Sequence, residues 1–260
     1  MQLIRSLAFN VLMYLWMPVV GLAYLPWAIV SPEGARRGCA FYARSTRRML
    51  AVVTGLRTET RGDVPRGECL VAAKHQSFLD ILVIYDDLPR AFFIMKSILV
   101  WAPILGVYAL RLGCIPVQRG RRSEAVRKML AEVQDGTRAG GQLVIYPQGT
   151  RVAPGARRDY KVGTFALYEQ LGQPCVPVAT NVGLFWPKRG VLRRPGTGVV
   201  EFLEPIPPGL DRPTFMALLE ERIEGRSNAL MEEAGFPVAL PGPPKGDPIA
   251  AAIADSERAG

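Results

Sequence analysis

The sequence predicts an α/β fold: a mixed β-sheet core flanked by helices, with an N-terminal hydrophobic, membrane-anchoring helical segment. Three observations predict it. The chain has 260 residues, which is enough for one large domain with its own core. Short apolar runs alternate with segments in which apolar residues recur at helical spacing, as they do in layered α/β proteins. Residues 6–32 contain no charged side chain.

The uncharged run at residues 6–32 predicts a membrane anchor, because about 20 apolar residues suffice to cross the hydrocarbon core. Pro18, Gly21 and Pro26 interrupt the run. They favour two short helices that enter one leaflet, although a tilted span stays open as an alternative. A cleaved signal peptide is disfavoured, because Arg5 fits its basic start but no small-x-small cleavage site follows.

A basic stretch comes next and predicts an amphipathic helix that lies on anionic lipid headgroups. Its basic residues are Arg36, Arg37, Arg44, Arg47 and Arg48. If the preceding run spans the membrane, these arginines place the remaining chain in the cytoplasm. We therefore expect membrane-anchoring helices at residues 1–55 and an active domain on the cytoplasmic face, which is that of the inner membrane in a bacterium.

The alternation of elements predicts a single domain at residues 56–236. Strands are expected at Leu56–Glu59, Cys69–Ala73, Phe92–Met95, Cys114–Val117, Leu143–Tyr146, Val176–Asn181 and Val199–Leu203. Helices are expected at Phe78–Asp87, Pro103–Leu110, Glu124–Ala139, Gly163–Leu171 and Pro213–Ala234. The last residues are rich in Pro, Gly and Ala, which predicts a disordered tail at residues 237–260.

The net charge and the cysteine spacing disfavour several kinds of function. Lys and Arg number 32 against 23 Asp and Glu, an excess of nine that suits nucleic acid, an anionic membrane or a phosphate-bearing substrate. Solvated surface charge is the alternative. Nucleic acid is disfavoured, because the chain has no zinc-finger spacing, RNP-type strand or basic-aromatic repeat. Four widely spaced cysteines disfavour a disulfide framework or a metal site and indicate buried thiols.

His75, the only histidine, is a candidate general base. It lies between an expected strand and an expected helix, at a joint where α/β folds bind ligands. Asp80 is five residues on, about 140° around a helix, so the two cannot meet on a continuous helix. If Ser77 caps the helix, His75 can fold back so that Asp80 orients its ring. The stretch also fits a capping box, in which Asp80 is a cap and His75 is structural.

Two basic turns are candidate phosphate sites. Arg119 follows an expected strand and, with two further arginines, precedes an expected helix. Cations oppose the helix dipole there unless an anion binds between them. The second turn contains Gln148, Gly149, Thr150 and Arg151, which offer close backbone approach, a hydroxyl and a bidentate fork for phosphate oxygens. Solvated turns use the same residues.

Taken in order, these segments resemble the glycerolipid acyltransferase family, which includes 1-acylglycerol-3-phosphate O-acyltransferases. Four blocks carry the resemblance: His75–Asp80 is similar to its H-x4-D block, Gly113–Arg119 to its apolar run ending in Arg, Tyr146–Arg151 to its F-P-E-G-T-R block, and Val176–Val178 to its V-P-V strand. The resemblance covers residues 56 to 202, which is most of the expected domain.

The resemblance implies acylation of lysophosphatidic acid to phosphatidic acid at a membrane, with acyl-CoA or acyl carrier protein as donor and no metal, other cofactor or acyl-enzyme. It implies that His75 activates the acceptor hydroxyl, that Asp80 supports it, and that Arg119 and Arg151 hold the acceptor phosphate. The chain departs from the family at Gln148, where Glu is usual. An ionic or proton-transfer role is therefore not expected at that position.

Three alternatives remain open. The nearest is the same chemistry on another lyso-lipid, such as a lyso-ornithine lipid. A hydrolase with a His–Asp pair is disfavoured, because the chain has no G-x-S-x-G nucleophile motif. A membrane-binding protein without catalysis would leave the sole histidine, Asp80 and the arginines unexplained.

Overall fold

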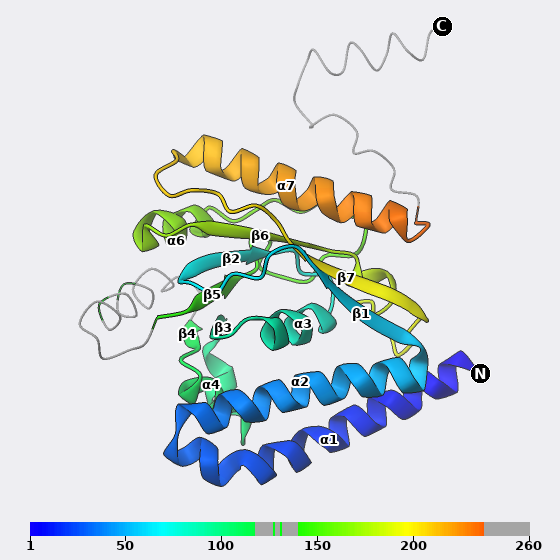
Figure 1. Cartoon of the computed structure of the whole chain (residues 1–260). Helices are drawn as coiled ribbons and strands as arrows, with labels where there is room; N and C mark the ends of the chain where they lie inside the picture. The colour runs from blue at the N-terminus through cyan, green and yellow to red at the C-terminus, as the bar shows by residue number, and fades with distance from the viewer. Residues whose placement is uncertain (118–126, 128–130, 132–139, 237–260) are drawn as a thin grey trace, which may run out of the picture.

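The computed structural model describes residues 1–117, 127, 131 and 140–236 (Figure 1). Apart from residues 127 and 131, the helix expected at residues 124–139 lies outside the described residues, and so does the expected tail at residues 237–260.

Seven strands form one sheet in the order β1-β7-β6-β2-β5-β3-β4. The strands are β1 (Leu56–Arg61), β2 (Cys69–Ala73), β3 (Ala91–Lys96), β4 (Ile115–Val117), β5 (Gln142–Ile145), β6 (Cys175–Thr180) and β7 (Gly196–Phe202). Neighbouring strands run parallel, except β6 and β7, which are antiparallel. The predicted mixed sheet flanked by helices is confirmed, and every expected strand has a counterpart.

Helices cover both faces of the sheet, with α6 and α7 on one face and α1, α2 and α3 on the other (Figure 1). The described helices that follow β2 are α3 (Leu79–Asp87), α4 (Leu105–Arg111), α6 (Gly163–Leu171) and α7 (Arg212–Glu233), with short 3-10 turns η1 (Ser97–Trp101) and η2 (Val182–Leu184). The two largest hydrophobic cores lie on opposite faces of the sheet. Leu70 and Ala72 of β2 belong to the core with α6 and α7, whereas Val71 and Ala73 face the opposite core.

The N-terminal segment forms two long helices that pack against each other, α1 (Gln2–Val30) and α2 (Pro32–Thr54). The expected break of the first run into two short helices is wrong, because α1 continues through Pro18 and Pro26. Each proline removes one backbone hydrogen bond, and the packing of α1 along its length holds the helix together. The chain breaks instead at Ser31, which is extended, as the residue before a proline prefers to be.

The first half of α1 is built into the domain. Phe9 is fully buried and contacts Trp186 edge-on, with ring centroids 5.5 Å apart. The hydroxyl of Ser6 accepts a hydrogen bond from the backbone N–H of Arg193 at 2.8 Å, and the guanidinium of Arg193 donates to Asn10 at 2.8 Å. One side of α1 is therefore fixed to the protein, and the opposite side carries a row of exposed apolar residues.

The basic stretch forms α2, as expected, but its arginines do not all face outward. Arg47 is only 16% exposed, and it bonds Asp86 at 2.8 Å and Asp87 at 3.3 Å, so it clamps α2 to α3. Four of the five arginines pair with carboxylates of the protein itself: Arg36 and Arg37 with Glu33, and Arg44 and Arg47 with Asp86. Part of the basic charge that was expected to bind lipid headgroups therefore holds the fold together.

Candidate active site

The strand β2 and the helix α3 are joined by a tight turn that brings His75 and Asp80 together. Nδ1 of His75 lies 2.9 Å from one carboxylate oxygen of Asp80. The other oxygen accepts hydrogen bonds from the backbone N–H groups of Gln76 at 2.9 Å and Ser77 at 2.7 Å. The helix begins at Leu79, so the residues before it leave the helical path and His75 folds back over the first turn.

The two roles considered for Asp80 coexist in one geometry. Its carboxylate is fully buried, accepts two backbone N–H groups at the start of the helix and orients the imidazole. Ser77 was expected as the N-cap, but Phe78 holds that position. The Ser77 hydroxyl still accepts a hydrogen bond from the backbone N–H of Leu79 at 3.1 Å. With Nδ1 facing a carboxylate, the proton belongs on Nδ1, and Nε2 is left with a lone pair.

Tyr146 covers the ring of His75, a contact that sequence reasoning missed. The two rings are stacked with centroids 3.9 Å apart and 21° between their planes, and the ring of Phe93 lies near that of Tyr146, with centroids 6.5 Å apart. Burial, followed by the nearby Asp80 carboxylate, raises the pKa of Tyr146 well above its ordinary value. Tyr146 therefore stays neutral and shields one face of the imidazole. The sequence held one sign of this role, because Tyr146 is the first residue of the block Tyr146–Arg151.

The block Tyr146–Arg151 lies beside His75. The backbone N–H of Val152 donates to the carbonyl oxygen of His75 at 2.8 Å, which ties the turn to the strand–helix joint. Gly149 adopts a φ of 69°, a left-handed conformation that favours glycine and lets the turn close on Tyr146. Thr150 and Arg151 are partly exposed at the end of this turn. The structure thus brings both residues to the edge of the sheet where His75 lies.

Lys188 is a further cation at this turn that the sequence did not single out. Its ammonium donates to the carbonyl oxygen of Arg151 at 2.8 Å and lies 3.4 Å from the hydroxyl of Thr150. No motif surrounds Lys188, so only the fold reveals it.

The two remaining predicted residues are placed differently. Gln148 is 2% exposed, and its amide points into a buried polar cluster with Glu224 of α7 rather than to the surface. Arg119 lies outside the described residues, two positions beyond the end of β4. Among the described residues, no group of His, Cys, Asp and Glu could hold a metal ion.

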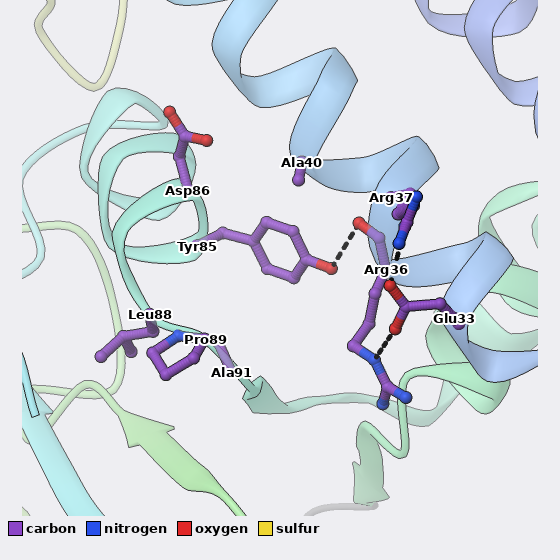
Figure 2. A pocket seen from close by; sticks show the side chains of 9 residues that line it. All are labelled: Glu33, Arg36, Arg37, Ala40, Tyr85, Asp86, Leu88, Pro89 and Ala91. Carbon is purple, nitrogen blue, oxygen red and sulfur yellow. Dashed lines mark hydrogen bonds and ion pairs between the residues drawn. The ribbon is translucent and has the colours of Figure 1, made fainter. Parts of the chain in front are cut away.

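A pocket of about 220 Å³ lies away from these residues, between α2 and α3 (Figure 2). Arg36 and Arg37 of α2 form one wall, and Glu33 pairs with both through bonds of 3.2 and 2.8 Å, which offsets one of their two charges. Tyr85 points from α3 across the pocket to the backbone carbonyl of Arg36 (Figure 2). The lining contains none of the predicted site residues, so this pocket is not the centre where His75 acts.

Comparison with known proteins agrees with the geometry. A protein-family model described as Acyltransferase matches residues 55–181. A 1-acyl-sn-glycerol-3-phosphate acyltransferase of Pseudomonas aeruginosa is 28% identical over 197 residues, which cover 75% of each chain. The human enzyme of that name, alpha form, is 30% identical over 174 residues, 65% of this chain and 62% of that protein.

A solved structure shows the same fold. The crystal structure of the 1-acyl-sn-glycerophosphate (LPA) acyltransferase PlsC from Thermotoga maritima superposes with a TM-score of 0.73 at 19% identity. The match covers 92% of this chain and 98% of that one.

Proposed function

We propose that this chain, whose residues 55–181 match a family model described as Acyltransferase, acylates the free hydroxyl of lysophosphatidic acid to give phosphatidic acid. The acyl group comes from acyl-CoA or acyl carrier protein. The observation that carries this proposal is the buried Asp80 carboxylate 2.9 Å from Nδ1 of the only histidine. That arrangement is what a general base for a hydroxyl requires.

In the proposed reaction, Nε2 of His75 takes the proton of the acceptor hydroxyl while its oxygen attacks the carbonyl carbon of the acyl thioester. A carbon–oxygen ester bond forms, the carbon–sulfur bond breaks, and the proton passes from His75 to the leaving sulfur. Asp80 keeps the imidazole in the required tautomer and stabilises its cation during transfer. The chain's own residues supply this chemistry without an acyl-enzyme intermediate.

The acceptor phosphate is assigned to the turn that contains Thr150 and Arg151. Arg151 offers two parallel donors that match phosphate oxygens, and Lys188 adds positive charge at the same turn. The distance between this turn and His75 is fixed by the backbone bond from Val152. Arg119 remains a proposed second phosphate ligand on the strength of the sequence motif.

We propose that the exposed apolar side of α1 enters one leaflet of the membrane. Among the described residues, α1 is the one helix long and apolar enough to cross a bilayer. One of its sides is bonded to the domain, so it lies along the protein instead of leaving it. The segment 98–110 adds the exposed apolar residues Ile98 and Trp101, which are 69% and 83% exposed, and the hydroxyl of Tyr108 in this segment donates to the backbone carbonyl of Gly21 in α1. From the arginines that follow α1 in the sequence, we propose that the catalytic domain lies on the cytoplasmic face.

The test uses the purified full chain in detergent or vesicles with radiolabelled acyl-CoA or acyl carrier protein and a panel of lyso-lipids. We expect phosphatidic acid to form from lysophosphatidic acid. His75→Ala should lower the rate by about 10²–10⁴-fold and leave folding and membrane attachment intact. Turnover of that variant within about tenfold of the parent would refute the general-base role. Equal acceptance of a lyso-ornithine lipid would move the proposal to the alternative acceptor.

A further inference from the structure

A partly buried charge cluster lies next to the proposed site. Lys74, the residue before His75, is 3% exposed, and its ammonium bonds both carboxylate oxygens of Glu224 at 2.5 and 2.6 Å. The carboxylate also accepts from the hydroxyl of Tyr160 at 2.9 Å and from the amide of Gln148 at 3.3 Å. Glu224 comes from α7, far away in sequence, and it touches neither His75 nor Asp80 directly.

Glu224 touches both halves of the site at once. Through Lys74 it holds the end of β2, where His75 begins the turn, and the backbone of Lys74 is fixed by a bond to Val178 at 2.9 Å. Through Gln148 it holds the turn that ends in Arg151. The general base and the phosphate-binding turn therefore share one side-chain bridge in addition to the backbone bond from Val152.

The cluster also accounts for glutamine at position 148. A buried ammonium needs a compensating negative charge, and Glu224 supplies one. A second carboxylate at position 148 would lie within about 3.3 Å of the first, where like charges disfavour ionisation. Negative charge is already crowded here, because burial and then the charge of Glu224 raise the pKa of Glu220, one turn earlier on α7. The neutral amide donates a hydrogen bond where a carboxylate would repel.

We propose that Glu224 is a positioning residue for the acyl transfer. From α7 it supplies the negative charge that Lys74 needs, so that position 148 can carry a neutral amide. It thereby fixes His75 and the 146–151 turn relative to each other. This inference rests on the proposed function. It predicts that the charge can be moved between the two positions, because Lys74 can donate to an amide oxygen at 224 while that amide donates to a carboxylate at 148.

The experiment compares Glu224→Gln, Gln148→Glu and the double variant, all in the full chain. We expect each single change to lower kcat/KM at least about tenfold, with kcat falling and the acceptor KM rising together, because the two halves of the site lose register. The double variant should recover to within about threefold of the parent, which is a non-additive result. Glu221→Gln is the matched control, since Glu221 is exposed on the same helix.

A second measurement does not depend on activity. Because the chain has one histidine, the imidazole Cε1–H signal in an NMR spectrum belongs to His75 alone. We expect Glu224→Gln to move this signal and the double variant to return it. A parent chain that acylates no lyso-lipid would refute the proposed function, and the NMR result would still decide the role of Glu224.

Two results would overturn the inference. One is a Glu224→Gln variant that has a lower melting temperature but unchanged kcat, KM and His75 signal, which is the behaviour of a merely structural residue. The other is a double variant no more active than the worse single variant.

Discussion

Replacing Asp80 by asparagine separates orientation of His75 from helix capping. The side chain keeps its shape but has one oxygen and one NH2 group. Two backbone N–H groups, of Gln76 and Ser77, require the oxygen on their side. The NH2 group must then face Nδ1 of His75, which forces the imidazole proton onto Nε2 and removes the base. The loss in kcat should be about 10²–10⁴-fold.

The cost in stability should be small by comparison. Hydrogen bonds to a charged group contribute about 1.5–3 kcal/mol each and those to a neutral group about 0.5–1.5 kcal/mol. Two weakened backbone bonds therefore lower the free energy of unfolding by about 2 kcal/mol, or about 4–8 °C in melting temperature for a domain of this size. The assay pairs initial rates of phosphatidic acid formation at saturating substrate with calorimetric melting in the same detergent.

Ser77→Ala is the matched control, because it removes only the hydrogen bond that the Ser77 hydroxyl accepts from the backbone N–H of Leu79. It should cost about 1 kcal/mol of stability and keep kcat within about threefold, since proton transfer is untouched. If Asp80→Asn loses stability yet turns over within about tenfold of the parent, Asp80 is a cap and the reasoning about His75 fails.

Three further predictions concern the anchor, the phosphate and the stacked ring. Deleting residues 1–30 should cause aggregation or a lower melting temperature rather than release an active soluble domain, because Phe9 and Met13 are core residues; a soluble truncated domain with the parent's melting temperature would contradict this. Arg151→Lys should raise the acceptor KM, measured beside the donor KM, because lysine lacks the bidentate fork; a larger rise for the donor would assign the arginine to the donor's phosphates. Tyr146→Ala should lower kcat by about tenfold and Tyr146→Phe should not, since phenylalanine keeps the ring over His75; equal rates for the two variants would show that the stack is irrelevant.

Much of the fold follows from local patterns. The strands and helices were predictable because apolar periodicity is a property of short windows. The proximity of His75 and Asp80 was predictable because the turn between them is only a few residues long. The family resemblance added the order of the blocks. The exact role of each block residue depended on three-dimensional neighbours.

The predictions that were wrong or missed share one cause: they depend on contacts between segments that are distant in sequence. Proline signals indicated a break in α1, but tertiary packing outweighed the loss of a hydrogen bond at Pro18 and Pro26. The charge pattern of α2 gave no sign that Arg47 meets Asp86, because they come from different helices. Nothing in the sequence near Lys74 indicated that its counter-charge comes from α7.

The docking of α1 also sets an order of events during synthesis. Gln2 and Ser6 are bonded to Arg193, across separations of 191 and 187 residues. At 5–20 residues per second, the ribosome needs about 10–40 s to deliver that partner after the first helix has emerged. Throughout that interval the apolar surface of α1 must be sheltered by a lipid leaflet or a chaperone. Under the proposed anchoring of α1, the helix can enter the bilayer before the sheet assembles and can dock against Arg193 only after that residue has been made.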